Sequence, residues 1–145
     1  MPHHCTIRNI GLLSRLKEID IMILKIEKLT IYVDSQDDAL KFWTEKMGFN
    51  CLIDQPMGPD ARWIEVSPND DPELTTLVLF SKALMTEQSP QSIAHPSIMF
   101  SSLEIDTLWE QLKNNGVELN EIKEYAHGKM FDFRDNEGNP YMVHG

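Results

Sequence analysis

Polar side chains alternate with apolar ones along residues 25–33, and this segment carries the first groups that could do chemistry. Lys28, Thr30 and Tyr32 fall on one face of a predicted half-buried strand. A lysine inside a pocket needs a carboxylate partner or an anionic ligand. If it is desolvated, the Lys28 amine can act as a base or form an imine. The alternative, which we favour, is that Lys28 reaches the pocket mouth as an ordinary surface amine.

Two histidines are the candidates for metal binding. His95 and His144 share strand parity with Ser97 and Met142, so they form an offset pair that could in principle hold a metal ion. The sequence favours the alternative, in which His95 begins a strand and His144 is a near-terminal surface residue. No serine has a nucleophile context such as GxSxG, and no phosphate-binding loop occurs. Recognisable catalytic motifs are therefore missing from the sequence.

The composition excludes several classes of partner. The formal net charge is −10 at pH 7, whereas binding to nucleic acid or to an anionic membrane needs clustered Lys and Arg. Cys5 and Cys51 form neither a CxxC pair nor a disulfide framework, and a reduced cytosol is the simplest setting for them. No apolar run approaches the ~20 residues that span a bilayer. We therefore expect a cytoplasmic protein without nucleic-acid or membrane partners.

The elements that position these residues begin with a first module, residues 23–82. After the strand that contains Lys28, Asp34 and Ser35 offer helix N-caps, and Gly48 stands where the helix should end. Three further strands are bounded by turn residues and are predicted over 49–53, 62–66 and 75–80.

The same order of elements recurs after a polar linker, residues 83–94. In the second module, residues 95–145, Leu108 and Leu112 mark a helix that Gly116 stops. Its strands are predicted over 95–103, 117–122, 129–134 and 141–144. The chain therefore reads as two βαβββ modules, which together form a single α+β domain of residues 23–145.

The N-terminal extension, residues 1–22, is predicted to lie outside this domain. Its apolar residues could form one stripe of a short amphipathic helix. Met22 begins the strand-like segment, and Lys17-Glu18 can be encoded by a purine run that resembles a ribosome-binding site. We hypothesise that Met22 is the natural start, which a native peptide spanning Lys17 to Lys25 would contradict.

Four segments carry a resemblance to a known family. YVDSQDDALKFWTEKMGF (32–49) and FRDNEGNPYMV (133–143) resemble the opening and the closing of the vicinal-oxygen-chelate (VOC) superfamily, which contains glyoxalases, bleomycin resistance proteins and dioxygenases. ARWIEV and TTLVLF lie between them at suitable spacing. The resemblance covers about residues 24–144. It implies mixed sheets that form a cup around a ligand, helices on the outside, and a homodimer.

The resemblance also implies four inward positions at which metal-dependent members place His, Gln or Glu. In this sequence we align these positions with Lys28, Leu79, Ser97 and Met142. Lysine is a cation, leucine has no donor atom, and methionine suits soft metals only. The sequence therefore predicts neither a metal site nor another cofactor.

We interpret the protein as a metal-free binding or sequestering protein for a small molecule. Two alternatives stay open: a lyase, isomerase or dioxygenase with an unusual metal site or a Lys28-centred mechanism, and a scaffold whose cup is packed shut. Near Trp63 the strand parity is ambiguous, so Arg62 is the alternative inward residue. We expect the ligand to be lined by side chains from both modules, namely Lys28, Thr30, Tyr32, Trp63, Leu79, Ser97, Met99 and Met142.

Overall fold

A computed structural model describes residues 22–71 and 73–145. Most of the predicted N-terminal extension, residues 1–21, lies outside the described residues. The described chain starts with an exposed extended segment that leads into the first strand. No helix of the described residues is long and apolar enough to cross a membrane.

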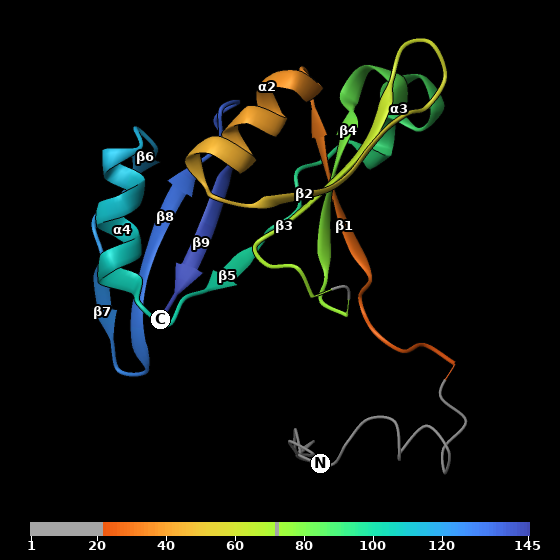
Figure 1. The fold of residues 1–145 in the computed structure, drawn as a ribbon. Coiled ribbons are helices and arrows are strands. Elements are labelled where there is room, and N and C mark those ends of the chain that lie inside the picture. Colours follow the sequence, from red (N-terminus) through yellow and green to blue (C-terminus); the bar gives the residue numbers. More distant parts are fainter. Residues whose placement is uncertain (1–21, 72) are drawn as a thin grey trace.

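The first module has the predicted order of elements and forms a four-stranded sheet, here called sheet one (Figure 1). Its strands lie in the order β1-β4-β3-β2, with β1 parallel to β4 and the other pairs antiparallel. The elements of the module are β1 (Lys28–Val33), α2 (Gln36–Lys41), the π-helical turn η1 (Phe42–Lys46), β2 (Asn50–Pro56), β3 (Arg62–Ser67) and β4 (Thr76–Ser81).

The second module repeats this arrangement and forms sheet two, in the order β5-β9-β8-β6, with β7 also paired to β8. Its strand β5 is parallel to β9, as β1 is to β4 in the first module. The elements of the module are β5 (Met99–Ser101), α4 (Ile105–Asn114), β6 (Glu118–Leu119), β7 (Lys123–Tyr125), β8 (Gly128–Arg134) and β9 (Pro140–His144).

Some boundaries differ from the sequence-based prediction. The predicted polar linker contains most of the helix α3 (Lys82–Gln88), which Ser81 caps, and the turn η2 (Pro90–Ser92). The strand predicted over 95–103 is reduced to β5, and the one predicted over 117–122 is reduced to β6, with the separate β7 beyond it. The α+β fold of two βαβββ modules with open, cup-like sheets is confirmed.

Local sequence signals explain where the first helix begins and ends. The Ser35 hydroxyl accepts a hydrogen bond from the backbone N–H of Asp38 at 3.2 Å, which satisfies one of the free donors at the helix start. Gly48, with a φ of +77°, terminates the helical segment, because glycine adopts this left-handed conformation without strain.

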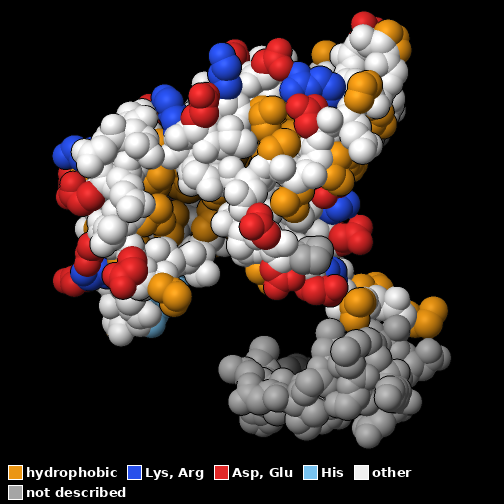
Figure 2. Space-filling model, in the orientation of Figure 1, with side chains coloured by type: hydrophobic (Ala, Val, Ile, Leu, Met, Phe, Trp, Pro, Cys, Tyr) orange, Lys and Arg blue, Asp and Glu red, His pale blue; other side chains and the backbone are white. Residues whose placement is uncertain are grey.

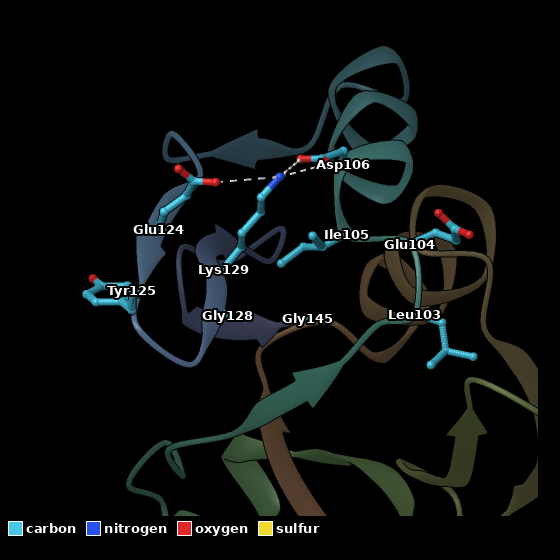
Figure 3. Close-up of a pocket in the computed structure, with 9 residues that line it drawn as sticks. All are labelled: Leu103, Glu104, Ile105, Asp106, Glu124, Tyr125, Gly128, Lys129 and Gly145. Carbon is cyan, nitrogen blue, oxygen red and sulfur yellow. Dashed lines mark hydrogen bonds and ion pairs between the residues drawn. The ribbon is translucent and has the colours of Figure 1, made fainter.

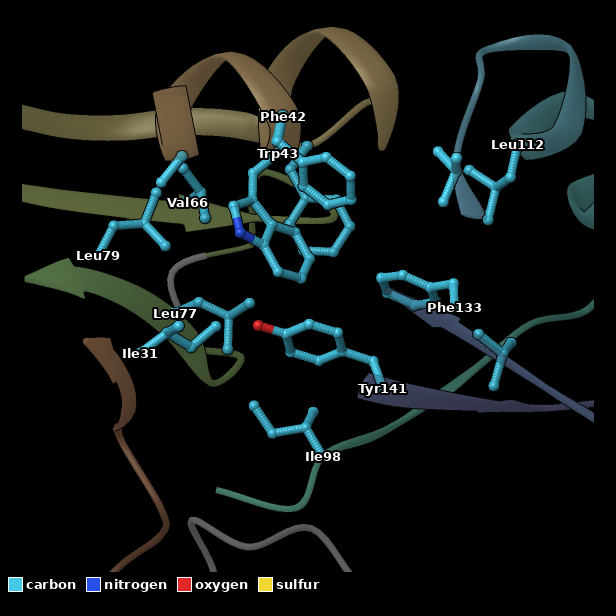
Figure 4. Packing of buried hydrophobic residues seen from close by; sticks show 14 of the residues in the cluster. Ile31, Phe42, Trp43, Val66, Leu77, Leu79, Ile98, Leu112, Phe133 and Tyr141 are labelled. Atoms are coloured by element: carbon cyan, nitrogen blue, oxygen red, sulfur yellow. The ribbon is translucent and has the colours of Figure 1, made fainter. Parts of the chain in front are cut away.

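Aromatic residues from both modules share one hydrophobic core (Figure 4). The π-helical turn places the adjacent residues Phe42 and Trp43 in the core together, and Trp43 is fully buried. The Trp43 ring lies 5.0 Å from the Tyr141 ring and 6.1 Å from the Phe133 ring of sheet two. The helical segment of module one thereby packs on the sheet of module two.

A polar contact also joins the modules. The side chain of Glu137, in the turn between β8 and β9, accepts hydrogen bonds from the backbone N–H groups of Asp34 at 2.8 Å and Ser35 at 3.4 Å. These N–H groups lie just before α2. The second module therefore supplies a hydrogen-bond acceptor for backbone donors at the start of the first module's helix.

Candidate functional site

One face of sheet one carries polar and aromatic side chains, while the opposite face packs under α2. Across the sheet Thr30 is paired with Val78, and Val78 with Glu65, so these three residues share one row. Because strand residues two apart point to the same side, the rows before and after this one lie on the same face. This polar face includes Lys28, Thr30, Tyr32, Trp63, Glu65, Thr76, Val78 and Phe80.

Glu65 ties the charged end of the polar face together. Its carboxylate belongs to a residue that is only 4% exposed. It accepts hydrogen bonds from Lys28 Nζ at 2.8 Å, Trp63 Nε1 at 2.7 Å and Thr76 Oγ1 at 3.1 Å. Burial raises the pKa of Glu65, but the hydrogen bonds from these three donors outweigh burial and hold the pKa below its ordinary value. The ionised carboxylate therefore fixes the orientation of the ammonium and the indole.

Lys28 thus has the carboxylate partner that an inward lysine requires. Its side chain is 33% exposed, whereas that of Glu65 is 5% exposed. Within the described part of the chain, the Lys28 ammonium donates only to Glu65. Since an ammonium has three N–H donors, two remain for water or a ligand. Lys28 is held in an ion pair rather than standing alone as a surface amine.

The other end of the polar face is aromatic. Tyr32, Phe80 and Trp63 lie in one row across β1, β4 and β3, with Phe80 buried in the middle. The ring of Phe80 lies 6.5 Å from that of Tyr32 and 6.0 Å from that of Trp63. Both outer rings remain partly exposed and can contact a ligand.

Trp63, not Arg62, is the inward residue of β3. The Arg62 guanidinium forms ion pairs with Asp37 in α2 and with Asp54 in β2, the latter at 3.0 Å. These two carboxylates hold the Arg62 side chain away from the polar face. The sequence left this choice open, and the structure resolves it in favour of Trp63.

Sheet two presents a face rich in methionine on the side opposite α4. Met99 is paired with Met142, and Met130 with His144. Methionine is flexible and polarizable, so a surface of this kind adapts to apolar partners of different shapes. Next to Met142 lies a cavity of about 290 Å³, which Ser97, Asp132 and His95 also line.

The predicted binding residues fall into separate groups within one chain. Lys28, Thr30, Tyr32 and Trp63 share the polar face of sheet one. Ser97 and Met142 line the cavity on sheet two, whereas Met99 is 53% exposed and lines a groove between the modules. Of five cavities among the described residues, none is lined by predicted binding residues of both sheets.

Leu79 does not lie on the polar face, so the prediction that it points inward is wrong. It is fully buried in the hydrophobic core and is paired with Ile31 and Ile64 on the helix-covered side of the sheet. Val78 lies on the polar face instead. Because β4 is buried on both faces, its sequence shows no alternation that could have revealed the correct parity.

The residues that the sequence aligns with the family's metal positions do not fit a catalytic divalent ion. With Val78 in place of Leu79 they are Lys28, Val78, Ser97 and Met142, and only Met142 has a donor typical of a metal ligand, a soft one. His95 Nε2 contacts the carbonyl oxygen of Pro140 at 3.2 Å. Among residues 22–71 and 73–145, no group of three or more His, Cys, Asp or Glu side chains is placed to hold a metal ion.

Larger hollows lie elsewhere. A shallow one of about 580 Å³ between α4 and β8 contains the ion pair of Lys129 with Asp106, whose closest N···O distance is 2.9 Å (Figure 3). Another, of about 550 Å³, is the groove between the modules that Phe49, Leu74 and Phe100 line. Figure 2 shows hydrophobic side chains in the recess between the modules.

Comparison with known proteins agrees with this architecture. The chain is 41% identical to the uncharacterized protein YetH of Bacillus subtilis strain 168 over 123 residues, which cover 84% of this chain and 98% of YetH. It is 37% identical to YurT of the same organism over 98 residues, which cover 65% of this chain and 76% of YurT.

A solved structure with a related sequence is TnmS3, described as an antibiotic binding protein from Streptomyces sp. CB03234. It has a TM-score of 0.70 and 26% sequence identity, and the match covers 86% of this chain and 97% of TnmS3. The family model of the Glyoxalase/Bleomycin resistance protein/Dioxygenase superfamily matches residues 25–143. The chain therefore belongs to the glyoxalase/bleomycin resistance protein/dioxygenase superfamily, the family that its opening and closing segments resemble.

Proposed function

We propose that this protein binds and sequesters a small organic molecule in the cytoplasm as a homodimer, without a metal ion. The observation that carries the proposal is the polar face of sheet one, where the Lys28–Glu65 ion pair stands beside a row of aromatic rings. Side chains of this kind give a binding surface a few fixed polar groups on an apolar wall. The chemistry of the family's metal positions supports a metal-free site.

The similarity to TnmS3 supports binding as the activity. That protein is described as binding an antibiotic, and we infer that this chain likewise takes an organic molecule. In our proposal the ligand contacts Lys28, Thr30, Tyr32 and Trp63 from sheet one. From sheet two it contacts Ser97, Met99 and Met142.

A homodimer is proposed because the two binding faces lie apart within one chain. Both β1 and β5 are edge strands, with pairing groups that a second chain can cover. A second copy related by two-fold symmetry can bring sheet one of one protomer against sheet two of the other. Light scattering at micromolar concentration tests this assembly, and a monomer would contradict it.

A Lys28-assisted lyase or isomerase is the second candidate, and the ion pair argues against it. An amine that forms an imine must be free to attack a carbonyl carbon, whereas the Lys28 nitrogen is engaged with the buried Glu65 carboxylate at 2.8 Å. Trapping a substrate on Lys28 with borohydride would revive this candidate.

Native mass spectrometry of freshly purified protein tests the binding function directly. We expect a co-purifying or added small molecule, one per protomer, and no stoichiometric metal. Tyr32→Ala and Lys28→Met should weaken binding by about tenfold or more, whereas the control Lys129→Met, in the ion pair on sheet two, should not. Tight metal binding that disappears in Met142→Ala or His144→Ala would overturn the proposal, as would binding that neither sheet-one variant changes.

A further inference from the structure

Polarity changes along the polar face of sheet one, from aromatic rings at one end to charges at the other. The row of Tyr32, Phe80 and Trp63 is followed, two residues along each strand, by the row that contains Glu65. Since a strand rises about 3.3 Å per residue, neighbouring rows lie about 6.6 Å apart. A fused pair of six-membered rings is long enough to bridge the two rows.

We propose, on the basis of the binding function above, that this face selects flat aromatic molecules with an uncharged oxygen acceptor. In this arrangement the ring system lies against Tyr32 and Trp63, and a ketone or quinone oxygen accepts a hydrogen bond from Lys28. Glu65 is the positioning residue, because it holds both the Lys28 ammonium and the Trp63 indole.

The aromatic preference follows from how the Trp63 ring is held. Its only polar group, the indole N–H, already donates to Glu65 at 2.7 Å. A ligand can therefore cover the ring without leaving a buried donor unpaired. Phe80 is buried at 6% exposure and supports the Tyr32 and Trp63 rings from between them, so flat contact costs little side-chain freedom.

The preference for an uncharged oxygen follows from the ion pair. Lys28 is already neutralised by Glu65, and the whole chain carries a formal charge of −10. A ligand carboxylate at the ammonium would stand close to the ionised Glu65 carboxylate, which repels it. A ligand cation would in turn meet the charge of Lys28. A neutral acceptor needs only one of the N–H donors that Glu65 leaves available.

Four probes on one carbon skeleton test this selectivity. They are 2-acetylnaphthalene, the anion 2-naphthoate, the cation 2-naphthylmethylammonium, and the non-planar ketone 2-acetyldecalin. Calorimetric titration of the full-length protein at pH 7 gives the affinity of each probe. Chemical-shift mapping shows which residues the bound probe contacts. We expect 2-acetylnaphthalene to bind about tenfold more tightly than each of the others, with shifts at Tyr32 and Trp63.

Variants that neutralise one charge of the ion pair then separate a role of Glu65 in positioning Lys28 from a role in holding the fold. In Glu65→Gln the Lys28 charge loses its partner, so the preference should move to 2-naphthoate by about tenfold. In Lys28→Gln the Glu65 charge is left alone, so the preference should move to 2-naphthylmethylammonium. The matched control Asp106→Asn removes the carboxylate that pairs with Lys129 on sheet two and should leave the order of the probes unchanged.

The outcomes are distinguishable. The proposed ligand class is overturned if the order of the four probe affinities is unchanged in the folded charge-neutralised variants, or if the decalin ketone binds most tightly. If circular dichroism shows that one of the two variants does not fold, the other variant alone is enough for this test. Failure of all four probes also overturns the ligand class, and the binding function survives that result only if native mass spectrometry finds another molecule bound.

Discussion

The Lys28 ammonium reaches across an intervening strand to the carboxylate of Glu65, 2.8 Å away. Thr76, on that intervening strand β4, donates to the same carboxylate at 3.1 Å. One ion pair and its hydrogen bonds thus connect three strands of the sheet. Glu65 is far more buried than Lys28. Removing Lys28 therefore leaves a buried carboxylate without its counter-charge, and the cost of desolvating that carboxylate is no longer offset.

Replacement of Lys28 by methionine should destabilise the protein. Replacing a lone inward cation would be neutral or stabilising, because such a cation is desolvated without compensation, but Lys28 has Glu65 as its partner. We expect Lys28→Met to lower the free energy of unfolding by about 1–3 kcal/mol, because the buried Glu65 carboxylate loses its counter-charge. Urea unfolding at pH 7 measures this change.

The Lys129–Asp106 pair provides the control for that measurement. Lys129 has a similar side-chain exposure, 34%, but its partner Asp106 is 68% exposed. Lys129→Met should therefore change the unfolding free energy little, since water solvates the remaining carboxylate. Equal effects of the two substitutions would show that burial of Glu65 is not the cause. The double variant Lys28→Met, Glu65→Leu should recover only part of the lost stability, because the Trp63 and Thr76 donors then lose their acceptor.

The lowered pKa of Glu65 predicts an acid-sensitive contribution to stability. A carboxyl group whose pKa is lower in the folded state stabilises that state above the pKa of the unfolded chain. For Glu65 the ordinary value is 4.5, so the stabilisation is complete above that pH and is lost as the pH falls through the lower, folded value. Glu65→Gln should make the acid limb of the stability curve shallower. Thermal unfolding between pH 7 and pH 3 tests this, and parallel curves would contradict it.

Glu137 should contribute to the attachment of the two modules. Its side chain is 13% exposed and accepts hydrogen bonds from the N–H groups of Asp34 and Ser35. Glu137→Ala should cost about 1–2 kcal/mol of unfolding free energy, the scale of a lost helix cap. Glu137→Gln keeps an acceptor and should cost less. Hydrogen exchange at the Asp34 and Ser35 amides should accelerate in the alanine variant only.

Trp43 should be among the most sensitive residues of the core. It is fully buried, and truncation to alanine should cost about 3–5 kcal/mol through lost burial and the cavity left behind. Trp43→Phe should cost less, because the indole N–H is buried without a hydrogen-bond partner in the described structure. Trp109→Ala, at a partly exposed site on α4, is the control, and an equal loss there would argue against a shared core.

The fold was predictable because strong local signals mark its elements. The Ser35 cap, the terminating Gly48 and Gly116, and the alternation in β1 are all visible in the sequence and recur in the structure. The boundaries of β5 and of the linker were not predictable in the same way. There the tertiary pairing decides which residues join a sheet, and α3 forms from residues with only weak helical periodicity.

The site was predictable only where strands alternate. Tyr32 and Thr30 lie on a half-buried strand, so their face could be assigned from spacing. Leu79 could not, because every residue from Thr76 to Phe80 is buried. Glu65 was missed because β3 is also buried on both faces from Ile64 to Ser67. The available signal was a carboxylate in a strand of a predicted cup that contains an inward lysine. The polar face of sheet one and the methionine-rich face of sheet two lie apart because of how the modules pack. No local sequence pattern encodes that packing, so this separation could not be predicted.

The aromatic contacts around Trp43 bear on how this duplicated chain can be divided. A cut in the linker would strip Trp43 of the Phe133 and Tyr141 rings and expose them on the other fragment. Each fragment would then present an apolar surface too large for a small soluble monomer. The repeats are thus architecturally similar but no longer autonomous, and the chain should melt in one cooperative transition. A half-length gene product should stay unfolded until its complement is supplied.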